Sequence, residues 1–81
     1  MSWIAKLRKT IQKYLPDAQV KRIHPLLSDR AIVSRKGRTY TILKKKGYEV
    51  YLDGRFIIYK RRLLATIYEI VQRERKLDFF E

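Results

Sequence analysis

The sequence predicts an α+β fold. In it, a four- to five-stranded antiparallel meander sheet carries an N-terminal and a C-terminal helix on one face. Two observations predict this class: apolar residues recur at helical spacing near both ends of the chain, and strand-like runs separated by glycine-containing turns fill the middle. Each expected helix has a single apolar stripe to bury, so both helices should pack on one side of the sheet. With 81 residues, we expect residues 1–81 to form one domain.

Residues 3–15 are expected to form the first helix. Ser2 is a suitable N-cap, and Pro16 ends the helix because its ring and missing N–H do not fit a helix interior. The apolar stripe of this helix comprises Ile4, Leu7, Ile11, Tyr14 and Leu15.

Residues 18–24 are expected to form a short strand, which His24 and Pro25 end. His24 is the only histidine. Without neighbouring cysteines or paired carboxylates it is a loop residue rather than a metal ligand.

Residues 31–59 carry the signature of an antiparallel meander. The runs are rich in β-branched and aromatic residues, and Asp53-Gly54 is the strongest hairpin signal because glycine supplies the positive φ of a two-residue turn. The expected strands are 31–35, 38–44, 48–52 and 55–59.

Residues 61–77 are expected to form the second helix, with Glu69 and Arg73 as an i,i+4 ion pair. We expect Phe79 and Phe80 to be packed, and Glu69 and Glu74 to lie on the helix surface. The buried stripe of this helix is expected to comprise Leu63, Leu64, Ile67, Ile70, Val71 and Leu77.

The period of two along a strand assigns the strand residues to two faces. The residues expected to face the helices are Ile32, Tyr40, Ile42, Tyr48, Val50, Leu52, Phe56 and Ile58. The residues expected on the outer face are Val33, Arg35, Thr39, Thr41, Leu43, Glu49, Tyr51, Arg55, Ile57 and Tyr59. The residues expected to be largely buried include Trp3, Leu7, Ile11, Ile42, Val50, Phe56, Ile67 and Ile70.

The charge of the chain indicates its class of partner. Twenty Lys and Arg against eight Asp and Glu give a net charge of +12, and residues 30–62 alone carry eleven basic and two acidic side chains. Self-repulsion of this size opposes folding, and a polyanion relieves it. We therefore expect a nucleic-acid-binding protein. Double-stranded DNA is favoured over RNA because the chain lacks a Gly-rich or RNP-like stacking motif.

The meander should gather the cations at its two ends, flanking an outer face that bears aromatic side chains. Lys60, Arg61 and Arg62 open the second helix, where a phosphate would meet guanidinium groups and free helix N–H groups. The candidate nucleic-acid-binding residues are Arg35, Lys36, Arg38, Lys44, Lys45, Lys46, Arg55, Lys60, Arg61, Arg62, Tyr51 and Tyr59.

Other classes of function have little support in the sequence. Cysteine is absent, and no pair of acidic residues is placed for metal-dependent phosphodiester chemistry. No Walker motif, nucleophile elbow or catalytic His-Asp pair is present either. We expect no enzymatic activity, metal, cofactor or small-molecule substrate. No apolar run approaches the length of a membrane span, so an intracellular, cytoplasmic or nucleoid-associated protein is expected. The basic, amphipathic first helix also fits a membrane surface, but the core needs its apolar side.

The alternative is a protein-interaction module, such as a dimeric accessory or inhibitor protein, that uses the outer sheet face. The scarcity of Asn, Gln and Met resembles the composition of proteins from hyperthermophiles. Size and basicity resemble the small basic proteins of archaeal chromosomes, plasmids and viruses, although no motif is shared.

Overall fold

The computed structural model describes residues 2–23 and 29–80. Five antiparallel strands form one meander sheet whose spatial order, β1-β2-β3-β4-β5, is their order in the chain. The elements are α1 (Trp3–Tyr14), β1 (Gln19–Arg22), β2 (Arg30–Arg35), β3 (Arg38–Lys44), β4 (Tyr48–Leu52), β5 (Arg55–Lys60) and α2 (Leu63–Phe80). His24 and Pro25 lie outside the described residues.

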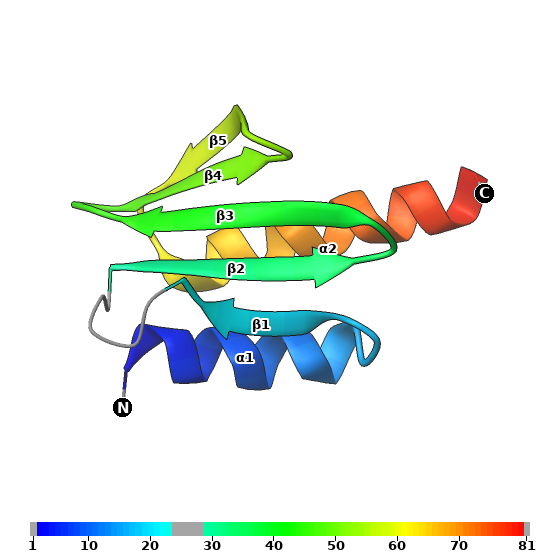
Figure 1. Ribbon diagram of the computed structural model, residues 1–81, viewed down its shortest axis with the longest axis horizontal. Coiled ribbons are helices and arrows are strands. Elements are labelled where there is room, and N and C mark those ends of the chain that lie inside the picture. Colours follow the sequence, from blue (N-terminus) through cyan, green and yellow to red (C-terminus); the bar gives the residue numbers. More distant parts are fainter. Residues whose placement is uncertain (1, 24–28, 81) are drawn as a thin grey trace.

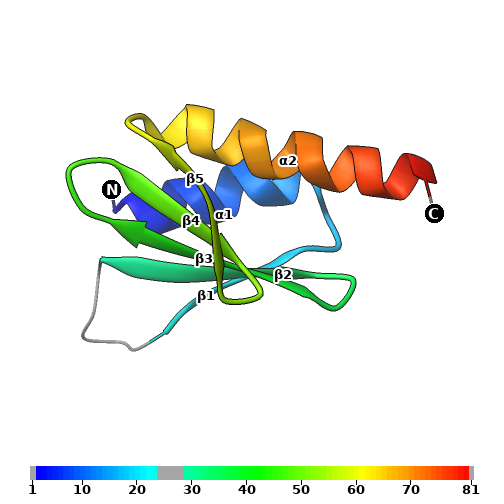
Figure 2. The same cartoon turned by 90° about the horizontal axis from the view of Figure 1, so that it is seen from above.

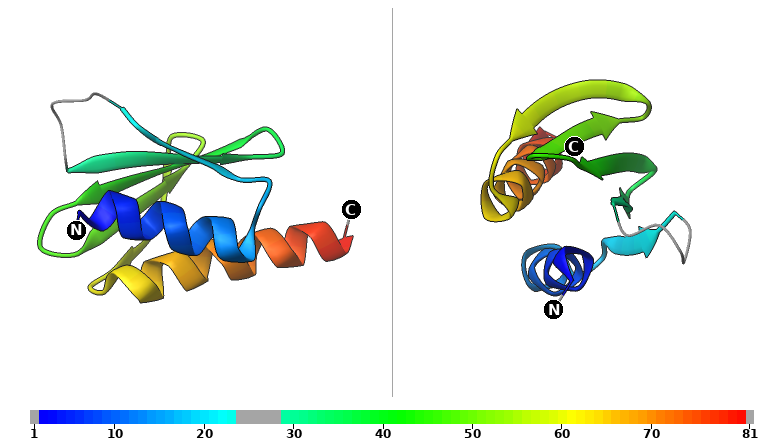
Figure 3. Two further views of the ribbon diagram at one scale, coloured as in Figure 1. Left: turned by 90° about the horizontal axis from the view of Figure 1, so that it is seen from below. Right: turned by 90° about the vertical axis from the view of Figure 1, so that its left-hand side faces the viewer.

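Both helices cover the same face of the sheet, as the sequence predicted, and the other face of the described sheet is open (Figures 1, 2 and 3). α1 packs on β1 and on α2, while α2 packs on β4 and β5. The fully buried core comprises, among others, Leu7, Ile11, Tyr40, Ile42, Val50, Ile67 and Ile70. Trp3, expected in this core, is only partly buried, against the ring of Tyr48.

The predicted start of α1 and the predicted hairpin turns are present. The Ser2 hydroxyl accepts a hydrogen bond from the Ala5 N–H at 3.2 Å, which caps the helix. Lys36 and Gly37 have φ values of 51° and 77°, and Asp53 and Gly54 have values of 49° and 85°. Positive φ at both central residues is typical of the type I′ turns that match the twist of two-residue hairpins.

The expected facing of β2 was wrong. Because the turn at 36–37 has two residues, Arg35 pairs with Arg38 and Val33 pairs with Tyr40. Val33 and Arg35 therefore share the inner face with Tyr40 and are buried, while Ile32 faces outward opposite Thr41.

Phe56 was also placed on the wrong face. The pairing of β4 with β5 shifts between Val50 and Tyr51, so that Val50 lies opposite Ile58 whereas Tyr51 lies opposite Phe56. This bulge inserts Ile57 as an extra residue and moves Phe56 to the outer face, where its side chain is 56% exposed.

The second helix differs from expectation along its length. It continues to Phe80, beyond the edge of the sheet (Figures 1 and 2), so its last residues have no strand beneath them. Leu77, Phe79 and Phe80 are consequently exposed. Leu64, at the start of the helix, is also exposed, whereas Glu74, expected on the surface, is completely buried. Neither described helix has the length and apolarity that crossing a membrane would require.

Candidate nucleic-acid interface

The arrangement of helices and strands gives the molecule two ends, which differ in how their charged side chains are paired. The turns at 36–37 and 53–54 lie at one end, together with the last turns of both helices (Figure 1). The turn at 45–47 lies at the other end, beside the starts of α1 and α2 (Figures 1 and 2). Trp3, the first residue of α1, contacts Tyr48 there, with ring centroids 5.5 Å apart.

At the first end, three carboxylates neutralise the cations, and one of them, Glu74, is fully buried. The Arg35 guanidinium donates to Asp17 at 2.8 Å, to Glu74 at 3.0 Å and to both carboxylate oxygens of Asp78 at 2.9 and 2.6 Å. Lys36 donates to Asp78 at 2.9 Å. These contacts connect the loop after α1, the β2–β3 hairpin and the last turns of α2.

Glu74 is the centre of this network. Arg38 donates two hydrogen bonds to its carboxylate, both at 2.8 Å, and the Tyr40 hydroxyl donates a third at 2.5 Å. Together with the bond from Arg35, these contacts satisfy a carboxylate that has no solvent exposure. A buried charge requires this degree of pairing because its desolvation is costly.

The pKa values of the network follow from these contacts. Burial alone would raise the pKa of Glu74, but the hydrogen bonds from Arg38, Tyr40 and Arg35 hold that pKa below its ordinary value. Hydrogen bonds from Arg35 and Lys36 hold the pKa of Asp78 well below its usual range. Burial and the bond to Glu74 raise the pKa of the Tyr40 hydroxyl.

We call this end of the molecule, with Asp17, Glu74, Asp78 and their partners, the carboxylate end. Three candidate binding residues lie in it: Arg35, Lys36 and Arg38. Arg35, expected on the outer face, is only 8% exposed. The three cations face three carboxylates, those of Asp17, Glu74 and Asp78, so little positive charge remains for a polyanion here. Arg55, in the neighbouring hairpin, was also expected on the outer face, but it pairs with Leu52 and so lies on the side of the helices. It is exposed and makes no ion pair among the described residues.

The opposite end keeps its positive charge. We call it the basic end and define it by Lys44, Lys45, Lys46, Lys60, Arg61 and Arg62. Among residues 2–23 and 29–80, one ion pair involves these six cations, from Lys45 to Glu49 at 3.4 Å. Asp29, at the same end, pairs with Arg30. The six cations of the basic end, together with Arg30, therefore share the two carboxylates of Glu49 and Asp29.

The fold brings the two basic segments together through a close backbone approach. Tyr48 pairs with Lys60 at the end of the sheet, which places the 45–47 turn beside the exit from β5. Gly47 is buried there, and a Cβ at this position would lie 2.5 Å from the Tyr59 hydroxyl and 2.7 Å from the Lys60 carbonyl oxygen. Glycine is thus needed for this approach, and the sequence alone showed only a turn residue.

The start of α2 adds directed polar groups to the basic end. The Arg62 carbonyl accepts hydrogen bonds from the Thr66 N–H at 3.1 Å and from its hydroxyl at 2.9 Å. The first turn of α2 contains no acidic side chain, and Arg61 and Arg62 are exposed. The positive ends of both helix macrodipoles therefore reinforce the basic cluster.

The two candidate tyrosines lie on the open face of the sheet, in different environments. Tyr59 is 44% exposed, opposite Glu49 in the pairing of β4 with β5. Tyr51 is partly buried, with its ring edge-on to Phe56 at 5.6 Å and its hydroxyl donating to Glu49 at 3.3 Å. Phe56 is an aromatic of this face that the sequence reasoning missed, because only the bulge moves it outward.

No family model matches this chain, and none of the curated proteins or solved structures is significantly similar to it.

Proposed function

We propose that the protein is a non-enzymatic nucleic-acid-binding protein that holds double-stranded DNA at the basic end through phosphate contacts, with little sequence preference. One observation carries this proposal: three carboxylates, one of them fully buried, neutralise the cations of one end, whereas the cations of the other end are mostly exposed and almost unpaired among the described residues. Phosphates release condensed counterions when such cations replace them, which favours binding.

Within the basic end, Arg61 and Arg62 are the proposed main anchors. They stand at the start of α2, where guanidinium forks and the free N–H groups of the first helical turn can meet the same phosphate. Lys45 already forms an ion pair with Glu49. Lysines on a turn also lose more side-chain entropy for each phosphate contact than the arginines at the start of α2.

Fluorescence anisotropy with a labelled short duplex, over a series of salt concentrations, tests this proposal. Contacts to about five phosphates give a log–log slope near −4.5, so binding should weaken roughly 500-fold between 50 and 200 mM salt. Changing Arg61 and Arg62 together to Ala should weaken binding at least about tenfold and flatten the slope by about two units.

The matched control is Lys9→Ala with Lys13→Ala, which removes the same charge from the exposed side of α1. It should change affinity much less. A flat salt dependence, or equal losses for both double variants, would contradict the proposal. If the triple Ala variant of Lys44, Lys45 and Lys46 loses more affinity than the double Arg variant, the main anchor is the turn. Tighter binding of a single strand of equal length would overturn the preference for duplex DNA.

The open face of the sheet supports a second candidate, a protein-interaction module. Phe56 is 56% exposed on this face, and Ile32 faces the same side. The two helices cover the opposite face of the sheet and leave these side chains uncovered. This candidate gains weight only if duplex DNA fails to bind at low salt.

A further inference from the structure

Two aromatic side chains project from the end of α2 without a packing partner on the sheet. Phe79 and Phe80 are each 81% exposed, the highest values among the large exposed hydrophobic residues. Their rings contact each other edge-on, with centroids 5.2 Å apart. Exposing both rings to water costs free energy, which a binding partner could recover.

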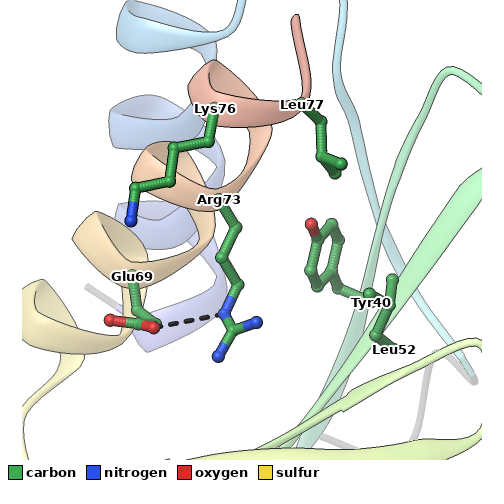
Figure 4. A pocket seen from close by; sticks show the side chains of 6 residues that line it. All are labelled: Tyr40, Leu52, Glu69, Arg73, Lys76 and Leu77. Carbon is green, nitrogen blue, oxygen red and sulfur yellow. Dashed lines mark hydrogen bonds and ion pairs between the residues drawn. The ribbon is translucent and has the colours of Figure 1, made fainter. Parts of the chain in front are cut away.

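A cavity of about 410 Å³ lies one helical turn away, between α2 and the sheet (Figure 4). Tyr40, Leu52 and Leu77 supply its apolar surfaces. Lys76 and the ion pair from Arg73 to Glu69, at 3.1 Å, supply its charged groups. Apolar walls with nearby cations suit an aromatic ring, which gains from both burial and cation–π contact.

The spacing along α2 relates the cavity to Phe80. Arg73, Lys76, Leu77 and Phe80 follow the i, i+3, i+4, i+7 pattern and therefore share one helix face. Phe79 is rotated away from that face. Phe80 thus continues, beyond the sheet edge, the side of α2 that walls the cavity.

We infer that the occupant of this cavity is Phe80 of a second copy of the chain, inserted reciprocally in a two-fold dimer. If two α2 helices pack antiparallel with the axis near Leu77, each Phe80 lies three residues, or about 4.5 Å, beyond the axis, opposite residues 73–74 of the other copy. Arg73 lines the cavity, so the ring of Phe80 would lie beside it. The same contact is made twice, so the assembly is closed.

Charge opposes a second copy least at this place. Two chains of net charge +12 repel each other over most of their surfaces. The region around the last turns of α2 carries less unbalanced charge, because Asp17, Glu74 and Asp78 balance Arg35, Lys36 and Arg38, and Glu69 pairs with Arg73. Among the described residues of α2, this leaves Arg75 and Lys76 as cations without an ion pair. The two copies therefore meet where their mutual repulsion is weakest.

Sedimentation equilibrium over a concentration series tests the inference. The wild-type protein should shift with concentration from 9.8 kDa to twice that mass. Phe80→Ala should weaken the dimer by about 100-fold or more, because two rings lose their burial in each dimer. Phe79→Ala, which removes an equally exposed ring from the neighbouring face, is the matched control and should have a much smaller effect.

Complementation distinguishes insertion from a general hydrophobic contact. Leu52→Trp should fill the cavity and abolish the homodimer while leaving Phe80 intact, with circular dichroism confirming the fold. Mixing this variant with Phe80→Ala should restore a heterodimer, because one intact ring then meets one intact cavity. A wild-type protein that stays monomeric, equal losses for Phe79→Ala and Phe80→Ala, or failure of the folded mixture to associate would each overturn the inference.

Discussion

Glu74 is a carboxylate at a core position. Its spacing along the helix indicates this position, but a search for apolar residues alone misses it. Glu74 and Asp78 continue the stripe of Ile67, Ile70 and Val71 at intervals of three and four residues, where an apolar side chain would be expected. Arg35 and Arg38 supply the compensating charge from β2 and β3. The partners belong to distant segments, so their pairing depends on a register that had to be known first.

Glu74→Gln should destabilise the protein by about 3–5 kcal/mol, because the change leaves Arg35 and Arg38 without their buried counter-charge. Urea unfolding measures the loss. Glu69→Gln removes a carboxylate from the same helix at a partly exposed i,i+4 pair, and as a control it should cost less than about 1 kcal/mol. Similar losses in both variants would show that burial of Glu74 does not determine the stability of this end.

The same substitution should change how stability depends on pH. The folded-state pKa values of Glu74, Asp78 and Asp17 are lowered, so the unfolded chain binds more protons in acid. Their contribution to stability is complete above the ordinary carboxyl pKa values of about 4, and it is lost as pH falls toward the folded-state pKa values. Unfolding measured along a pH series should therefore show a steep acid limb in the wild type. The limb should be shallower in Glu74→Gln.

At the scale of elements, local sequence signals were sufficient to predict which helices and strands form and in what order. They were not sufficient to predict which face of the sheet each strand residue occupies. Apolar periodicity, Ser2, Pro16 and the glycine turns predicted two helices and a meander on physical grounds that act within a few residues. The face of β2 depends on whether the turn at 36–37 has two residues, and the face of Phe56 depends on a bulge. A shift of one residue reverses every side chain, so these small uncertainties moved Arg35 from the expected surface into the core.

Gly47→Ala should disrupt the meeting of the 45–47 turn with β5. The added Cβ would lie within 2.7 Å of both the Tyr59 hydroxyl and a backbone oxygen of Lys60, and the backbone atom cannot yield without moving the strand. We expect a loss of about 1–3 kcal/mol, as for other overpacked sites. Thermal unfolding measures this, with Lys46→Ala in the same turn as a control that should be almost neutral. An unchanged midpoint for Gly47→Ala would contradict the close approach.

At the scale of the whole molecule, the two proposed surfaces lie at opposite ends of an axis 37 Å long. The basic end holds the starts of both helices, and the projecting end of α2 carries Phe80 (Figure 1). A dimer joined through α2 would therefore direct its two basic ends away from each other. Such a particle has two separate sites for DNA, and linked sites allow one assembly to hold two duplexes.

DNA bridging should therefore require the dimer, whereas DNA binding should not. Wild-type protein should let a duplex fixed on beads capture a second, labelled duplex. Phe80→Ala should bind the fixed duplex with nearly unchanged affinity, because its basic end is intact, yet capture little of the second. Adding Leu52→Trp to that variant should restore capture through the heterodimer, while Arg61→Ala with Arg62→Ala should lose both activities. If the monomeric Phe80→Ala variant bridges as well as the wild type, a single chain must carry two DNA sites. The inference that free positive charge is concentrated at the basic end alone would then be wrong.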